Sequence, residues 1–139
     1  MRKNSSASRS TGPLTGLVYI PLIGGPDVFA HLEDFNFEDR HLNTGLDMQV
    51  AAAVPVAELA EYPLAEVRIA AWDPVRQEEV FRIDSGNGWN AGVLSTAGNL
   101  VFQGEASGEF AAYRADDGAQ LWSSYVRTGI QAAPITFAV

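Results

Sequence analysis

The stretch GWNAGVLSTAGNLVFQGEASGEFAAYRADDGAQLW, residues 88–122, decides the fold prediction. Turn signals divide it and the residues just after it into four short apolar pieces, at 91–96, 100–103, 110–114 and 121–125. The turns contain Gly-Asn, Ser-Gly and Asp-Gly, which tolerate the positive φ angles of tight hairpins. Four consecutive strands with no helical period between them predict one antiparallel sheet.

A weak internal repeat extends this prediction. Ala71-Trp72 and Val80-Phe81 recur 41 residues later as Ala112-Tyr113 and Leu121-Trp122. Residues 16–19 match residues 99–102 at an offset of 83, close to twice that value. A period of about 40–45 residues with four strands per repeat is typical of a β-propeller. The sequence therefore predicts an all-β fold of about two four-stranded antiparallel blades with flanking strands, and packing between blades for the recurring aromatic residues.

The rest of the chain is less regular. Residues 1–13 are rich in Ser and Arg and are predicted to be a disordered N-terminal segment, ahead of the blades at 14–139. Strands are expected at 15–23, 68–72, 79–83 and 132–138. Residues 24–63 are expected to form a long excursion on one rim, with a possible short helix at 50–60 that Pro55 would interrupt.

Length and composition limit the classes of function. A propeller needs roughly 4–8 blades to close, so 139 residues with two repeats predict part of a longer polypeptide. The net charge of −8 disfavours nucleic acid and anionic membranes as partners. Without cysteine the chain has no thiolate metal site and no haem-attachment motif. Residues 17–23 are too short to span a membrane, and no signal peptide is visible.

Trp89-Asn90 is the candidate binding pair. It follows a flexible Ser-Gly-Asn-Gly run and precedes the first strand of its blade, which in a propeller lines the central channel. A flat aromatic ring beside an amide suits a planar polar ligand through stacking and hydrogen bonding. The alternative is a Trp that covers the blade edge and an Asn that caps a turn. Pattern alone leaves both open; the equivalent place one repeat later, Ile130-Gln131, is expected at the same rim.

No catalytic or metal-binding constellation is visible. His31 and His41 are ten residues apart, which matches no zinc spacing. The acidic run around them lacks the Gly at the sixth position of a calcium loop, so a solvated acidic loop is predicted for Glu33, Asp34, Glu38 and Asp39. The Gly-Asn-Gly at 86–88 opens no helix and is rejected as a dinucleotide loop, and no Gly-x-Ser-x-Gly is present.

Several strings resemble the C-terminal part of the pyrroloquinoline quinone (PQQ)-dependent, or quinoprotein, alcohol dehydrogenases. They are TGLVYIP (15–21), NTGLD (43–47), AWDPVRQEEVFR (71–82), GWNAGVLSTAGNLVFQG (88–104), AYRADDGAQLW (112–122) and TGIQAAPITF (128–137). The resemblance covers most of residues 13–139, and the run 88–137 is the most specific part. It implies a partial eight-bladed β-propeller. Trp122 and Phe81 fall on docking-motif tryptophan positions, the second as a conservative departure.

The resemblance also implies chemistry. Such enzymes are typically periplasmic and oxidise alcohols with PQQ and a calcium or lanthanide ion, passing electrons to an acceptor such as a cytochrome c. The family's Trp-Asn-Gly-Gly corresponds to Trp89-Asn90-Ala91-Gly92, which implies cofactor-binding roles for Trp89 and Asn90 and a methyl group added at Ala91. The family's catalytic Asp, metal ligands and vicinal disulfide would lie in blades absent from this chain. The chain is thus expected to form one wall of the quinone pocket and to be inactive alone.

A non-catalytic propeller scaffold for protein–protein interaction is the alternative. A scaffold needs no polar pair at the mouth of the channel, so Trp89-Asn90 favours the dehydrogenase. Neither interpretation identifies the alcohol.

Overall fold

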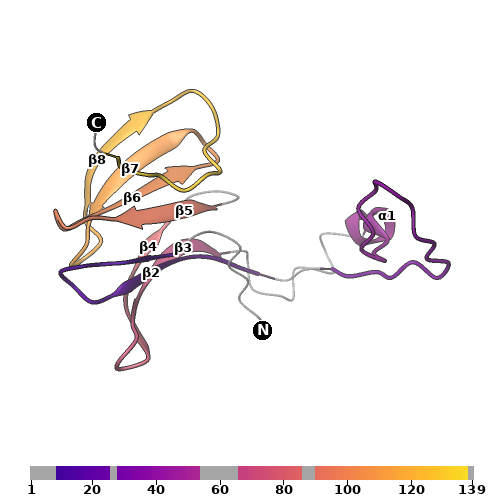
Figure 1. Cartoon of the computed structure of the whole chain (residues 1–139), viewed down its shortest axis with the longest axis horizontal. Helices are drawn as coiled ribbons and strands as arrows, with labels where there is room; N and C mark the ends of the chain where they lie inside the picture. The colour runs from indigo at the N-terminus through magenta and orange to yellow at the C-terminus, as the bar shows by residue number, and fades with distance from the viewer. Residues whose placement is uncertain (1–8, 26–27, 54–65, 86–89, 138–139) are drawn as a thin grey trace. The chain divides into compact units, whose positions relative to one another are not determined.

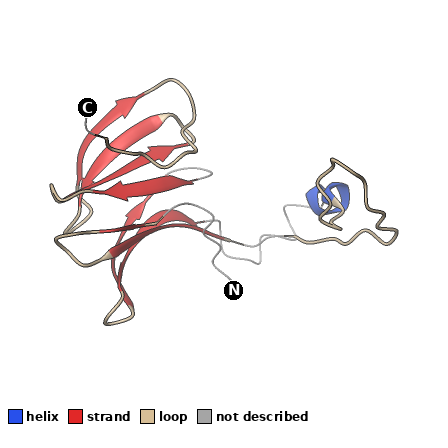
Figure 2. Cartoon of the chain, viewed as in Figure 1, coloured by secondary structure: helices blue, strands red, loops and turns tan. Residues whose placement is uncertain are grey.

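The computed structural model describes residues 9–25, 28–53, 66–85 and 90–137. These residues form two compact units, residues 25–65 being the second and the rest the first. The first unit contains two four-stranded antiparallel sheets (Figures 1 and 2). In the first sheet β1 (Ser10–Thr11), β2 (Val18–Gly24), β3 (Glu66–Asp73) and β4 (Glu78–Asp84) lie in sequence order, and the second sheet continues with β5 (Asn90–Ser95), β6 (Leu100–Glu105), β7 (Glu109–Arg114) and β8 (Gln120–Tyr125). Two antiparallel meanders of this kind confirm the predicted pair of blades.

The two sheets repeat each other in register. Tyr19 opposes Ala71 in the first sheet as Phe102 opposes Ala112 in the second. The pairing of the third and fourth strands shifts register at Ala71/Trp72 and again at Ala112/Tyr113, 41 residues later. The sequence repeat is therefore a structural repeat, down to the position of the β-bulge.

The offset of 83 residues had been interpreted wrongly as two repeats. Strands β2 and β6 are the second strands of neighbouring sheets, one repeat apart. The offset is larger than the 41-residue repeat because Gly25–Ala65 is inserted between β2 and β3, whereas the second sheet has only the short turn 106–108 at the equivalent place. The predicted excursion at 24–63 thus exists, and it accounts for the offset without a third blade.

Three predicted elements differ from the structure. Residues 132–137 form no strand, although a strand was expected at 132–138. The helix expected at 50–60 overlaps α1 (Met48–Ala52), which begins earlier because the Asp47 carboxylate caps it by accepting the N–H groups of Gln49 and Val50; residues 54–60 lie outside the described part. Within the segment predicted to be disordered, Ser10 and Thr11 pair with β2 as strand β1; residues 1–8 lie outside the described part.

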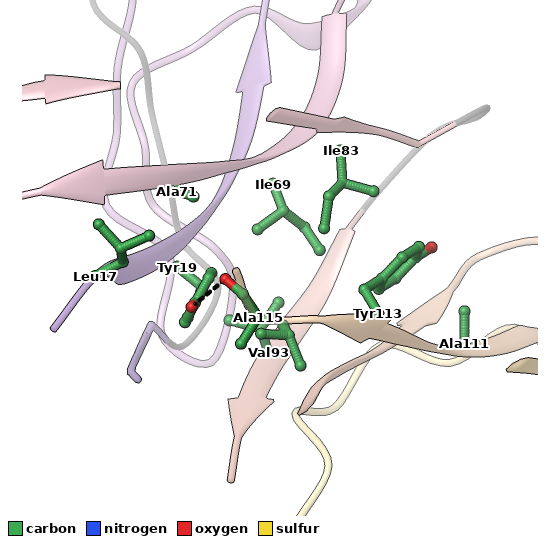
Figure 3. Close-up of a cluster of buried hydrophobic side chains, with 10 residues drawn as sticks. Leu17, Tyr19, Ile69, Ala71, Ile83, Val93, Ala111, Tyr113 and Ala115 are labelled. Carbon is green, nitrogen blue, oxygen red and sulfur yellow. Dashed lines mark hydrogen bonds between the residues drawn. The ribbon is translucent and has the colours of Figure 1, made fainter. Parts of the chain in front are cut away.

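The core lies between the two sheets. The first sheet contributes a face that includes Tyr19, Ile69 and Ile83, and the second contributes Val93, Val101 and Tyr113 (Figure 3). Tyr19 is fully buried, and its hydroxyl donates a hydrogen bond of 2.7 Å to the Ala115 carbonyl of the second sheet. Because a buried hydroxyl without a partner would be costly, this bond fixes how the sheets face each other.

Gly118 allows the sheets to approach closely. It stands in the β7–β8 turn at a φ of +76°, and a Cβ there would lie 2.8 Å from Ile83 Cγ1 and 2.9 Å from Phe81 Cε2. Gln77 holds the equivalent place in the β3–β4 turn, with a φ of +59° and the same backbone bond to the residue four positions earlier. The turn conformation is shared, but at Gly118 the contact with the first sheet excludes a side chain.

The aromatic residues of the repeat do not all pack between the sheets as predicted. Tyr113 is buried there and Phe81 packs against the same core, which confirms the prediction for these two. Trp122 is 51% exposed on β8, and Trp72 is only half-buried, outside the core cluster. Equivalent positions thus have different surroundings because the described chain supplies only one interface between sheets.

We expect Gly118→Ala to lower the free energy of unfolding by about 2–4 kcal/mol, through backbone strain and overpacking together. The matched control is Gly16→Ala, since Gly16 has a φ of +69° but open space around its Cβ position, and should cost only about 1–2 kcal/mol. Urea unfolding of both variants measures the difference. Equal losses would show that the contact with Phe81 and Ile83 contributes nothing.

We expect the chain to lose stability as the pH rises above about 10. Burial, then the negative charges of Glu105 and Glu109, raise the pKa of Tyr113 to about 12. Burial likewise raises the pKa of Tyr19. Unfolded tyrosines lose their protons near pH 10 while the folded ones keep them, so stability is complete below that pH and falls until the folded groups ionise. Urea midpoints between pH 8 and 12 test this, and Tyr113→Phe should flatten the decline.

Candidate cofactor-binding site

The candidate site lies at the start of β5. Asn90 opens this strand and is paired with Glu105 of β6, and the register then shifts before Val93. The bulge contains Ala91, which is fully buried. A bulge at the end of an edge strand changes the direction in which neighbouring side chains point, and it is common beside binding sites. The structure thus places the backbone of Asn90 at a strand end; Trp89 lies outside the described residues.

Strand β5 is the first strand of its sheet and lies beside the first strand of the other sheet. Ser95 donates its backbone N–H to Ser10 Oγ at 2.9 Å, and Ser95 Oγ donates to the Thr11 carbonyl at 2.6 Å. The first strands of the two sheets therefore meet along one edge. In a propeller this arrangement is expected at the central channel, where the first strands of all blades converge.

Glu105 joins the two ends of the loop that leads to the site. Ser85, just after β4, donates its hydroxyl to Glu105 Oε1 at 2.9 Å, and its N–H bonds the Val67 carbonyl at 2.8 Å. Glu105 is also the strand partner of Asn90. Ser85 and Asn90, at the two ends of the loop, thus both contact Glu105, and these contacts fix the separation of the loop ends.

Sequence reasoning missed Glu105 and Ser85. Nothing in the local pattern shows that the Glu105 carboxylate reaches 20 positions back along the chain. The contact depends on the packing of the two sheets. A signal was present only in the polarity of Ser85 at the end of a strand.

Gln103 is a second polar residue that sequence analysis did not single out. It lies two residues before Glu105 on β6, is fully buried and is paired with Val93 of β5. Within the described part of the chain neither its Nε2 nor its Oε1 has a hydrogen-bond partner. Buried amides are nearly always satisfied, so an ordered water or a bound polar group is expected to contact it.

Ile130, the residue one repeat after Trp89, lies beside Glu105, the strand partner of Asn90. Ile130 donates its N–H to the Glu105 carbonyl at 2.9 Å, and its side chain fills the space where a Cβ on Gly104 would stand. The chain after β8 therefore returns to the β6–β7 turn. Gln131, beside it, is exposed.

The acidic loop contains no metal centre among the residues that the structure describes. His41 Nδ1 lies 3.5 Å from Glu38 Oε2 on the surface, and the bridge between His31 and Leu46 only closes the loop. Throughout the described ranges, no three side chains of His, Asp or Glu converge as metal ligands would. The described helix is too short to cross a membrane.

Comparison with known proteins identifies the fold and the family. No protein-family model matches the chain. It is 44% identical to the quinohemoprotein alcohol dehydrogenase ADH IIB of Pseudomonas putida over 131 residues, which are 94% of this chain and 18% of that enzyme. It is 38% identical to a 1-butanol dehydrogenase (cytochrome c) of Thauera butanivorans, covering 95% of this chain and 19% of the relative.

Solved structures agree. The quinohemoprotein alcohol dehydrogenase ADHIIG of Pseudomonas putida HK5 matches with a TM-score of 0.75 at 34% identity, over 96% of this chain and 20% of that one. The quinohemoprotein alcohol dehydrogenase of Comamonas testosteroni matches with a TM-score of 0.74 at 34% identity, again over 96% of this chain and 20% of that one. The chain belongs to the PQQ-dependent alcohol dehydrogenase family.

The chain spans about a fifth of the length of these relatives. A europium-containing methanol dehydrogenase matches at 22% identity with a TM-score of 0.57, which extends the likeness of fold alone. The two sheets are accordingly a part of a quinoprotein β-propeller: the repeat predicted the propeller, and the resemblance predicted the family.

We expect Ser85→Ala to lower the free energy of unfolding by about 1–2 kcal/mol, because the Glu105 carboxylate loses a partly buried hydrogen bond. Ser107→Ala is the control: Ser107 Oγ also donates to Glu105, at 3.2 Å, but it is exposed, so its loss should cost less than about 0.5 kcal/mol. Thermal unfolding of both variants tests this. Equal effects would remove the case that Ser85 anchors the loop.

Proposed function

We propose that the chain forms part of the propeller of a PQQ-dependent alcohol dehydrogenase and contributes one wall of the quinone pocket. The observation that carries this is that Asn90 begins the first strand of its sheet, with the loop ends around Trp89 held together by Glu105. The names of relatives that share up to 44% of its residues support an alcohol as substrate and a cytochrome c as electron acceptor.

The outer face of the second sheet supports continuation into a larger propeller. Its aromatic row of Phe102, Phe110 and Trp122 has ring centroids 6.0 and 6.2 Å apart. These positions are the structural equivalents of Tyr19, Ile69 and Phe81, the face with which the first sheet packs on the second. All of β8 is exposed. A face with the pattern of a sheet-to-sheet contact, and only partly covered, favours a further blade over an isolated module.

In the complete enzyme Trp89 and Asn90 would lie against the quinone, the ring by stacking and the amide by hydrogen bonding. The unpaired amide of Gln103 beside β5 is in keeping with a polar group or water at this edge. PQQ, when bound, supplies the two-electron acceptor for alcohol oxidation. The calcium or lanthanide ion would be held by residues outside this chain, as the family resemblance implies; the residues that the structure describes offer no ligand cluster. A periplasmic location is part of the same proposal.

The non-catalytic scaffold remains the second candidate. It would use the same sheets, but would give no role to the anchored loop end and the unpaired amide. Those two features favour the dehydrogenase.

A chimera tests the function. Replacing the matching fifth of the Pseudomonas putida enzyme ADH IIB with this chain should give PQQ-dependent oxidation of alcohols with an artificial electron acceptor. In the chimera Asn90→Ala should weaken PQQ binding about tenfold, from the loss of one hydrogen bond to a polar ligand. Asn36→Ala, in the exposed loop of the second unit, is the matched control and should leave binding unchanged.

Two results would contradict the proposal. One is a folded chimera that binds haem but takes up no PQQ. The other is stoichiometric binding of PQQ, or alcohol oxidation, by the 139-residue chain alone, since this would show that the missing blades are not needed.

A further inference from the structure

A cleft of about 550 Å³ lies between the outer strand of the first sheet and the second sheet. Strand β4 contributes Arg82 and Asp84 to its wall, and the second sheet contributes Glu105, Glu109 and Tyr113. The volume is within the range of small-molecule sites in proteins. Both walls belong to the same compact unit, so the cleft does not depend on the inserted segment.

The carboxylates of the cleft have no cationic partner. Glu105 accepts hydrogen bonds from the hydroxyls of Ser85 and Ser107, and Glu109 accepts one from the Gln120 amide at 3.3 Å. No ion pair among the described residues involves either glutamate or Asp84.

Arg82, the basic residue in the wall, does not neutralise them. Its Nε lies 2.8 Å from Glu79 Oε1, so its charge is already compensated on β4. The cleft therefore has an excess of negative charge, which attracts cations.

Tyr113 provides an independent sign of a ligand. It is 5% exposed and lines the cleft, yet its hydroxyl makes no hydrogen bond to any residue that the structure describes. Figure 3 shows its ring directed away from Ile69 and Val93, with the oxygen at the far end. The ring is buried but the oxygen itself stays accessible from the cleft, so it is free to hydrogen-bond with a molecule bound there. Burial, and after it the charges of Glu105 and Glu109, raise the pKa of Tyr113 to about 12, so the phenol stays protonated beside them.

The arrangement suits an organic cation better than a metal ion. In the described residues no three carboxylate or imidazole groups converge on one point. A guanidinium group spreads its charge over several N–H donors and can reach separated acceptors, and its alkyl stem can lie along apolar surface such as Ile83 and the Tyr113 ring.

We propose that this cleft binds a small organic cation, an alkylguanidinium or alkylammonium group, through Asp84 and Glu109 and the oxygen of Tyr113. The inference goes beyond the proposed function and does not rest on it: Asp84, Glu109 and the Tyr113 oxygen have no part in the proposed quinone contact, although Glu105 borders both sites.

Titration of the ¹⁵N-labelled 139-residue chain with n-butylguanidinium, followed by NMR, tests the proposal. Saturable shifts are expected for the backbone signals of Tyr113 and Gln120, and the same spectra report whether the chain is folded. n-Butylammonium should give the same shifts with weaker affinity, because it has fewer donors.

Two variants test the named groups. Asp84→Asn combined with Glu109→Gln should weaken binding at least tenfold, and Tyr113→Phe severalfold. The matched control is Glu33→Gln combined with Asp39→Asn in the second unit, which removes the same charge and should leave affinity unchanged.

Three outcomes would overturn the proposal. The first is no saturable shift at millimolar n-butylguanidinium. The second is equal weakening by the control double variant, which would indicate attraction by net charge alone. The third is tighter binding of Ca²⁺ than of n-butylguanidinium at the same signals, which would indicate a metal site.

Discussion

The structure depends on the packing of one face of the first sheet against the second sheet. Tyr19, Ile69 and Ile83 meet the second sheet in a single buried cluster. Burial of apolar area supplies the attraction, but it has no direction of its own. The bond from the Tyr19 hydroxyl to the Ala115 carbonyl and the close approach at Gly118 define the orientation. Two four-stranded sheets, each marginal alone, become one unit in this way.

Because the described chain has one interface between sheets, equivalent faces of the two sheets are buried to different extents. The first sheet buries its apolar face on the second, whereas the equivalent face of the second sheet has Trp122 half exposed. In a repeat protein each unit is stabilised mainly by its neighbours, so the last unit in a short array lacks part of its stabilisation. The match to about a fifth of much longer relatives is consistent with this.

Glu105 connects the interface with the candidate site. It is the strand partner of Asn90, and its carboxylate accepts a hydrogen bond from the Ser85 hydroxyl, just after the last strand of the other sheet. It also lines the cleft between the two sheets. A carboxylate at such a junction makes the geometry of the loop before β5 sensitive to how the sheets pack. The candidate cofactor wall and the interface are therefore not independent parts of the molecule.

The repeat shows where sequence reasoning succeeded. The aromatic and alanine pairs that recur after 41 residues predicted two blades correctly, because strand register and β-bulges are set by local side-chain alternation and turn chemistry. Residues 132–137 were wrongly expected to form a strand, since an apolar run pairs only if a neighbouring strand is available. The offset of 83 was misinterpreted because an insertion within a repeat leaves no signal in the repeat itself.

The sequence by itself determined the strands, their turns, the repeat and the family to which the chain is similar, all of which depend on neighbouring residues or on recurring strings. Only the tertiary structure decided which of two equivalent faces is buried, that Glu105 holds both ends of a loop, and that three carboxylates and a phenol line one cleft. The physical reason is that these contacts join residues from different sheets, and their partners are set by how the sheets pack rather than by any local pattern.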